Sequence, residues 1–359
     1  MERQPLRFAV IGTGYWGINY VRLLSELPDA EVVIVCDQNS ARLKEIERRF
    51  PRVQVTTDLH TALSQDIDAA VVATNATSHF EVVQACLKAG KHVLVEKPMT
   101  TRAAEANQLT ALASLMGLKL MVGHIFLYNA GIQKIRTYVA GNDLGKIYYV
   151  YAKRTNLGPI RTDVNALWDL ASHDVSIFNY LLDARPSWVS ATGSRVLCEG
   201  CREDVGFMVL QYPNGILGHI HVSWADPNKE RELVIVGSEA RVVFNDLNPM
   251  EQVRIFEKGV SYESMLDPSN HYEYKLLMRD GDIISPRIEA VEPLRNECLH
   301  FIDCVLHDKQ PLSHGQSGAD VIAIMEATNQ SLAMNGAPVE IKYEEVDEYK
   351  YIFTASPVR

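Results

Sequence analysis

Short apolar runs alternate with amphipathic helical patterns along the first third of the chain. Compact apolar runs predict buried strands, and apolar positions three and four residues apart predict helices. The predicted strands are 8–11, 30–36, 69–74, 92–96 and 119–123, and the helices between them include 79–89 and 102–116. Strands that alternate with helices in this way are typical of a doubly wound parallel sheet.

Beyond residue 124 the pattern changes to alternation of apolar and polar positions, which predicts an open, mostly antiparallel sheet. The predicted strands are 147–154, 188–196, 203–211, 216–224, 231–237 and 240–245, and the helices are 130–140, 168–182, 293–307 and 319–334. Residues 250–288 predict no regular element. A length of 359 residues suits two domains of roughly 100–200 residues each. We therefore expect an α/β domain at 1–123 and an α+β domain at 124–359, which serves substrate binding and oligomerisation.

Three glycines follow the first predicted strand in the order Gly-x-Gly-x-x-Gly. Gly12 allows a tight turn, Gly14 lets a pyrophosphate approach the backbone, and Gly17 lets the next helix pack closely on its strand. The second strand ends at Asp37, an acid that accepts hydrogen bonds from the ribose hydroxyls of NAD and repels the phosphate of NADP. No basic residue follows before Arg42. The sequence predicts an N-terminal Rossmann domain that binds NAD; a structural turn and a helix cap are the alternatives.

A lysine in the sequence Glu96-Lys97-Pro98 follows the fourth of these strands, at the edge of the sheet where a nicotinamide binds. Such a lysine can stabilise a substrate oxygen as charge develops on it, and the proline limits backbone freedom and permits a cis peptide bond. The alternative is a solvated lysine at a strand end.

Asp169 and His173 are four residues apart in a polar stretch of a predicted helix. This spacing puts both on one helix face, where the carboxylate can orient an imidazole that acts as a general base. A surface pair or a core histidine is the alternative.

Composition narrows the class of protein. A formal net charge of −10 disfavours nucleic-acid and anionic-membrane partners, and we expect a soluble cytoplasmic protein without a signal peptide or membrane span. Most of the 6 cysteines lie in apolar patterns. Cys198 and Cys201 alone have ligand-like spacing, and two further ligands are missing, so we expect no metal.

These motifs together resemble the glucose-fructose oxidoreductase and inositol dehydrogenase family (Gfo/Idh/MocA) over essentially the whole chain. The resemblance implies Lys97, Asp169 and His173 as catalytic residues. Asn75 stands where the family often has proline, and Asn129 is followed by alanine where proline is expected. The implied cofactor-binding residues are Gly12, Thr13, Gly14, Tyr15, Trp16, Gly17, Asp37, Thr74, Asn75, His79, Glu96 and Lys97, and the implied substrate-binding residues are Lys97, Arg154, Arg161, Asn165, Trp168 and His173.

Residues 154–161 and 163–169 are similar to the branch that includes UDP-N-acetylglucosamine 3-dehydrogenases. This similarity implies NAD-dependent oxidation of a secondary hydroxyl, at C3 of a nucleotide sugar such as UDP-N-acetylglucosamine or its uronate, to a 3-keto sugar. Arg154 and Arg161 would then bind a diphosphate or a carboxylate. The alternatives are an inositol-type dehydrogenase of free monosaccharides or polyols, a non-catalytic NAD-binding regulator, and a hydrolase that retains NAD.

The second sheet predicts an oligomer, because helices of one chain cover only one of its faces. We expect the other face to carry Phe207, Val209, Ile220 and Val222, or their alternating neighbours. An apolar sheet face of that size is an aggregation hazard in a monomer. The sequence therefore predicts a homodimer or homotetramer formed through this face.

Overall fold

The computed structural model describes residues 4–158, 160–161, 164–197, 200, 202–263 and 275–344. The chain forms two compact units. The first comprises residues 1–128, 291–326 and 342–359, and the second comprises 129–290 and 327–341. Cys198 and Cys201, the pair considered as metal ligands, lie outside the described residues.

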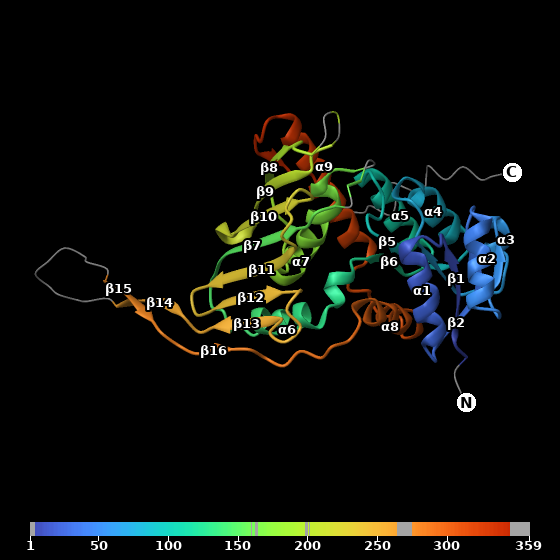
Figure 1. The fold of residues 1–359 in the computed structure, drawn as a ribbon, viewed down its shortest axis with the longest axis horizontal. Helices are drawn as coiled ribbons and strands as arrows, with labels where there is room; N and C mark the ends of the chain where they lie inside the picture. The colour runs from blue at the N-terminus through green and yellow to red at the C-terminus, as the bar shows by residue number, and fades with distance from the viewer. Residues whose placement is uncertain are drawn as a thin grey trace, which may run out of the picture. The chain divides into compact units, whose positions relative to one another are not determined.

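A six-stranded parallel sheet forms the centre of the first unit, in the order β3-β2-β1-β4-β5-β6 (Figure 1). The expected Rossmann architecture is confirmed, and all the strands predicted for it are present. The central strands are buried apolar runs, because helices cover both faces of such a sheet, whereas β3 at the edge is partly exposed. The strands are β1 (Leu6–Ile11), β2 (Ala30–Cys36), β3 (Gln54–Thr56), β4 (Ala69–Val72), β5 (His92–Glu96) and β6 (Leu120–Gly123).

The helices of the first unit include one from late in the chain, α8. Phe301 of α8 lies with its ring centroid 6.2 Å from that of Phe8 in β1. Residues 291–326 thus belong to the first unit, whereas the sequence patterns predict one domain over 124–359. They do so because the apolar face of α8 is buried against α1. The helices are α1 (Tyr15–Glu26), α2 (Ser40–Arg49), α3 (Leu59–Leu63), α4 (His79–Lys88), α5 (Ala103–Leu115) and α8 (Pro293–Leu306), with short turns η1 (Ala76–Ser78) and η2 (Ile125–Tyr128).

The second unit contains a nine-stranded sheet in the order β16-β13-β12-β11-β7-β10-β9-β8-β17. Its pairs are antiparallel except β10 with β7, so the expected mostly antiparallel sheet is confirmed. A further pair, β14 and β15, forms a separate hairpin (Figure 1). The strands are β7 (Ile147–Thr155), β8 (Trp188–Ser194), β9 (Val205–Gln211), β10 (Leu217–Ser223), β11 (Glu230–Gly237), β12 (Arg241–Asn245), β13 (Val253–Phe256), β14 (Gly259–Glu263), β15 (Lys275–Arg279), β16 (Ile283–Ile284) and β17 (Val339–Glu340).

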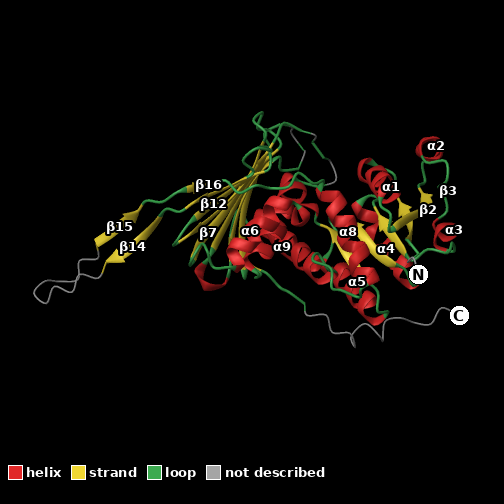
Figure 2. Ribbon diagram, turned by 90° about the horizontal axis from the view of Figure 1, so that it is seen from below, coloured by secondary structure: helices red, strands yellow, loops and turns green. Residues whose placement is uncertain are grey.

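Helix α6 (Ala130–Ala140) packs on one face of this sheet (Figure 2) and contacts both β12 and α7. The predicted helix 168–182 is divided into a π-helical turn, η3 (Leu167–Ala171), and α7 (Ser172–Leu182). A long helix, α9 (Gly315–Ala333), passes from the residues of the first unit to those of the second, and η4 (Pro213–Gly215) is a short turn between β9 and β10.

The opposite sheet face is lined by exposed aromatic and apolar side chains. Tyr149, Phe207 and Leu217 are each exposed over 44–45% of their surface. Ile220 and Val222 are fully buried, so their placement on the open face with Phe207 and Val209 is wrong. The register explains the error: Val209 pairs with His219 and Phe207 with His221, so Ile220 and Val222 face the helices.

Within the described residues, no helix combines the length and apolar character needed to span a membrane.

Candidate functional site

The glycine turn joins β1 to α1 at the carboxyl edge of the parallel sheet. Gly12 has a φ of +87°, and a Cβ there would lie 2.7 Å from the Ala73 carbonyl oxygen. A Cβ on Gly17 would lie 1.8 Å from the Gly12 oxygen, whereas a Cβ on Gly14 would have no atom within 4 Å. Gly12 and Gly17 are therefore required by close packing of the turn, and Gly14 leaves the N-terminus of α1 open to a ligand.

A cavity of about 680 Å³ lies against this turn. It is lined by Gly12, Gly14, Asp37, Thr74 and Asn75, which brings five of the predicted cofactor-binding residues together. These residues follow β1, β2 and β4, whose carboxyl ends meet at one edge of the sheet.

Asp37 is 8% exposed and is held by hydrogen bonds in this cavity. Its Oδ2 accepts from the amide and the hydroxyl of Thr13, both at 2.7 Å, and its Oδ1 accepts from the amide of Asn39 at 2.7 Å. Burial alone would raise the pKa of Asp37, but these hydrogen bonds outweigh it and the pKa is lowered. The carboxylate is thus fixed and ionised at neutral pH.

The sequence predicts no basic residue beside Asp37, but Arg42 lies next to it. Its Nη1 lies 3.6 Å from Asp37 Oδ2, and it lines the same cavity. The first turn of α2 carries the side chain back over the strand end. A basic residue is therefore present beside the acid, although Asp37 itself still excludes a ribose phosphate by charge.

Other predicted cofactor-binding residues do not line this cavity. Tyr15 and Trp16 are exposed at the start of α1, with their rings 5.4 Å apart. His79 is buried, and its two ring nitrogens lie 2.8 Å from the Pro98 oxygen and 3.1 Å from the Thr74 oxygen. The contacts of His79 therefore connect two strand ends within the protein.

The residues present fit NAD. The open backbone at Gly14 suits a pyrophosphate at a helix N-terminus, and the ionised Asp37 suits the hydroxyls of an adenosine ribose.

Lys97 follows β5 directly, at the same edge of the sheet, and the Lys97–Pro98 peptide bond is cis. Glu96, which precedes Lys97, is expected to contact the cofactor. In the structure its carboxyl group is instead buried in the interior of the first unit. Glu96 Oε1 accepts a hydrogen bond from Tyr20 at 3.0 Å, and Oε2 accepts from the Lys97 amide at 3.1 Å. Tyr20 and its second partner Glu297 carry no local motif, and sequence reasoning missed both.

Asp169 and His173 lie on η3 and the first turn of α7, respectively. Asp169 is therefore in a π-helical turn, which differs from the regular α-helix that the four-residue spacing assumed. Its Oδ1 accepts a hydrogen bond from Arg161 Nη1 at 3.0 Å, which joins two of the predicted functional residues. His173 is half-buried.

Arg154, expected to bind substrate, is buried and occupied by an acid of its own unit. Its Nε and Nη2 donate to the two carboxylate oxygens of Asp174 at 3.0 and 2.7 Å. Such a bidentate pair is strong, and breaking it would leave a buried charge.

Two more expected substrate residues support the π-helical turn. Asn165 accepts a hydrogen bond from the Trp168 amide at 3.0 Å, and the Trp168 side chain is buried.

Asn129 caps α6 by accepting a hydrogen bond from the Gly131 amide at 2.8 Å, and its side chain donates to Asp246 at 3.1 Å.

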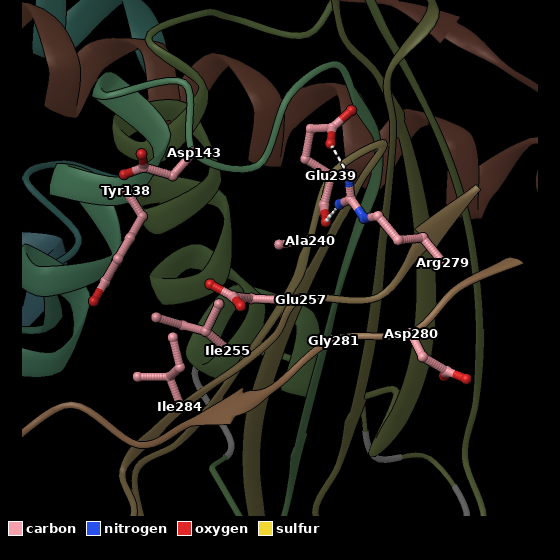
Figure 3. A pocket seen from close by; sticks show the side chains of 10 residues that line it. All are labelled: Tyr138, Asp143, Glu239, Ala240, Ile255, Glu257, Arg279, Asp280, Gly281 and Ile284. Atoms are coloured by element: carbon pink, nitrogen blue, oxygen red, sulfur yellow. Dashed lines mark hydrogen bonds and ion pairs between the residues drawn. The ribbon is translucent and has the colours of Figure 1, made fainter. Parts of the chain in front are cut away.

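A second cavity, of about 580 Å³, lies in the second unit (Figure 3) and contains none of the predicted site residues. Four carboxylates, of Asp143, Glu239, Glu257 and Asp280, line it, and Arg279 is bound to Glu239. In the described part of the chain, no group of three or more His, Cys, Asp or Glu residues is arranged to hold a metal ion.

Comparison with known proteins yields two family profiles along the chain. Residues 6–124 match the profile described as oxidoreductase family, NAD-binding Rossmann fold (GFO_IDH_MocA). Residues 132–243 match the GFO/IDH/MocA C-terminal domain.

Individual relatives span most of the chain. The myo-inositol 2-dehydrogenase of Thermotoga maritima is 24% identical over 95% of this chain and 99% of its own length. The UDP-N-acetylglucosamine 3-dehydrogenase of Acidithiobacillus ferrooxidans is 28% identical over 71% of this chain and 78% of its own. The crystal structure of GenD2 from gentamicin A biosynthesis, in complex with NAD, is 25% identical with a TM-score of 0.79, covering 95% of this chain and 98% of that one.

Proposed function

The chain belongs to the Gfo/Idh/MocA oxidoreductase family, and from this premise we propose that it oxidises a secondary hydroxyl at C3 of a nucleotide sugar to a ketone. At the coarser level it is an NAD-dependent dehydrogenase of the sugar and polyol class. The observation that carries the proposal is the position of Lys97, at the same sheet edge as the glycine turn and Asp37. This edge is where open α/β sheets bind their ligands.

The proposed chemistry assigns separate roles to three side chains. NAD, when bound, accepts the hydride from the carbon that bears the hydroxyl. His173 takes the hydroxyl proton as general base, and Lys97 stabilises the substrate oxygen while it carries negative charge. Asp169, held by Arg161, supports the imidazole electrostatically as it becomes positive.

A nucleotide sugar is the favoured substrate because Arg161, which donates to Asp169 through Nη1, carries a guanidinium, the group that best recognises phosphate or carboxylate. The UDP-N-acetylglucosamine 3-dehydrogenase among the relatives supports this class. The second candidate is an inositol-type polyol dehydrogenase. It is supported by the occupation of Arg154 by Asp174, which removes one of two expected diphosphate donors, and by the nearly full-length inositol relative.

A thermal-shift comparison of UDP with myo-inositol, both with NAD present, separates the two candidates. A ligand at 100 times its Kd stabilises the native state by about 2.7 kcal/mol. We expect UDP to raise the unfolding temperature of the wild-type protein and of Arg195→Ala, an exposed arginine control, but not of Arg161→Ala. A shift with myo-inositol and none with UDP would instead support the polyol enzyme.

Accumulation of NADH distinguishes a dehydrogenase from a non-catalytic NAD-binding regulator or a hydrolase that retains NAD. A dehydrogenase converts NAD to NADH in step with the sugar it consumes. Absorbance in the nicotinamide band during sugar turnover therefore distinguishes these classes.

Replacing Asp37 with alanine is expected to reduce the preference for NAD over NADP by at least about tenfold, or about 1.4 kcal/mol. The change removes the charge that repels a ribose phosphate and leaves Arg42, 3.6 Å away, to attract it. Dissociation constants for both cofactors measure the effect. Adding Arg42→Ala to the variant should weaken NADP binding again, and equal affinities of the wild-type protein for both cofactors would contradict the assignment.

We also infer that the open sheet face binds a second copy of the chain. Phe207 stacks on His221 with ring centroids 4.4 Å apart on this face, which also carries exposed Leu217 further along β10. Phe207→Asp should therefore reduce the mass measured by analytical ultracentrifugation at micromolar concentration to that of one 40.2 kDa chain. Leu115→Asp, equally exposed at the end of α5, should leave the oligomer intact. A 40.2 kDa species alone from the wild-type protein would exclude the interface.

A further inference from the structure

Two glutamates and one tyrosine meet in the interior of the first unit. Tyr20 on α1 and Glu297 on α8 are fully buried, and Glu96 at the end of β5 is 8% exposed. The Tyr20 hydroxyl oxygen lies 3.0 Å from Glu96 Oε1 and 3.2 Å from Glu297 Oε2. The three side chains come from segments far apart in the sequence.

The single hydroxyl hydrogen of Tyr20 is set against two carboxyl groups. A tyrosine hydroxyl has one hydrogen, so it can donate to only one of two carboxylates. The second contact is a hydrogen bond only if the other carboxyl group is protonated and donates to the tyrosine oxygen. Two ionised carboxylates so close and so deeply buried would also repel each other strongly.

The hydrogen bonds indicate which glutamate keeps the proton. Glu96 accepts from Tyr20 and also from the Lys97 amide at 3.1 Å, so two donors stabilise its negative charge. Glu297 Oε1 has no hydrogen-bond partner among the described residues. Burial raises the pKa of Glu96 to about 7, and burial together with the charge of Glu96 raises the pKa of Glu297 well above its usual value.

The backbone of β6 passes close to the Glu96 carboxylate at Gly123, which has no side chain. A Cβ on Gly123 of β6 would lie 3.4 Å from both Cδ and Oε2 of Glu96, so glycine keeps that side of the carboxylate open. His124 follows Gly123, and burial lowers its pKa to about 4, so it adds no positive charge near Lys97 at neutral pH.

Two further buried neighbours are neutral as well. Cys298 on α8 and Tyr128 after β6 interact electrostatically with Glu297, and burial raises the pKa of each well above its usual value. Lys97, the next residue after Glu96, interacts electrostatically with the Glu96 carboxylate and favours its ionised form.

We propose that Glu96 and Glu297 share one proton through the Tyr20 hydroxyl, and that the single negative charge left on Glu96 stabilises the ammonium of Lys97 for its role in oxidation. In the resting arrangement Glu297 donates its proton to Tyr20, and Tyr20 donates to Glu96. Tyr20, Glu96 and Glu297 are thus positioning residues that act through Lys97. The second half of the proposal rests on the proposed function, whereas the shared proton does not.

The shared proton is tested by titrating the full chain without NAD, using ¹³C NMR of labelled glutamate carboxyl groups. We expect one glutamate of the wild-type protein to remain protonated at pH 8, and this signal to be absent from Glu297→Gln. If Glu297→Gln does not fold, the wild-type titration decides alone, because ionisation of every glutamate at pH 6 overturns the proposal.

Two nearly isosteric variants should affect the Glu96 titration differently. Tyr20→Phe removes a donor to the carboxylate and should raise its midpoint by about one pH unit. Glu297→Gln replaces the neutral, protonated acid with a neutral amide that can still donate to Tyr20, and should leave the midpoint nearly unchanged. Glu292→Gln, which removes an exposed carboxylate at the N-terminus of α8, is the control and should change nothing. A clear fall of the Glu96 midpoint in Glu297→Gln would mean that Glu297 is ionised beside Glu96 in the wild type, which contradicts the shared proton.

The link to Lys97 is tested by the pH dependence of turnover. In Tyr20→Phe the acid limb of the profile should move to higher pH together with the Glu96 midpoint, and the plateau should stay within about threefold of the wild type. An unmoved limb with a moved midpoint overturns the link. Absence of sugar oxidation at any pH, with the titrations as expected, contradicts the proposed function and leaves the shared proton intact.

Discussion

Lys97→Ala is expected to lower the turnover of the sugar substrate by about 10²–10⁴, while NAD binding stays near the wild-type value. The reason is electrostatic. Negative charge develops on the substrate oxygen as its proton leaves, and a fixed ammonium in a water-poor site stabilises that charge far better than water does. The rate of NADH formation measures the loss, and titration with NAD checks the binding site.

The control for this variant is Lys88→Ala, which removes a lysine in the last turn of α4 whose Nζ donates to Gln84 on the same helix. His173→Ala should produce a loss similar to that of Lys97→Ala, partly restored by added imidazole. Near-wild-type turnover from a folded Lys97→Ala protein would exclude this lysine from the reaction.

The strands of both sheets could be predicted from local pattern because burial in a sheet leaves a direct record in the sequence. The run 30–36 predicts β2 at its observed bounds, and 130–140 does the same for α6. Strands β13 and β16 were missed because each is short, in a charged segment between turns. Pairing of β13 with β12 and of β16 with β13, rather than local propensity, makes them strands.

Part of the candidate site could likewise be predicted from the sequence, and part could not. The glycine turn and Asp37 could be predicted because one turn and one strand end contain the required chemistry. The partners of Glu96 could not, since Tyr20 and Glu297 are brought to it by packing of α1 against α8. Neither side chain differs in pattern from an ordinary helix residue, and only the tertiary fold reveals a buried acid pair.

The face of the second sheet was assigned wrongly for a related reason. Strand β9 carries apolar residues on both faces, so alternation within it does not fix which set faces the helices, whereas β10 alternates histidine with isoleucine and valine. Their antiparallel register determines it, because Phe207 and His221 are paired, and Ile220 pairs with Met208.

Two alanine substitutions in the glycine turn are expected to have large and different effects. Gly17→Ala would place a methyl group 1.8 Å from the Gly12 carbonyl oxygen, so α1 must move from its strand. Overpacking typically costs about 1–3 kcal/mol and more where backbone must move, so we expect a clear fall in unfolding temperature without NAD.

Gly14→Ala separates binding from folding in the same turn. The backbone at Gly14 has φ of −66° and ψ of −163°, which alanine adopts without strain, and its Cβ would meet no atom within 4 Å. The unfolding temperature without NAD should therefore be unchanged. The methyl group instead occupies the space through which a pyrophosphate approaches the N-terminus of α1, so the Kd for NAD should rise by about tenfold or more. Wild-type affinity in Gly14→Ala would mean that the pyrophosphate does not bind at this turn, because the substitution has no other route to an effect.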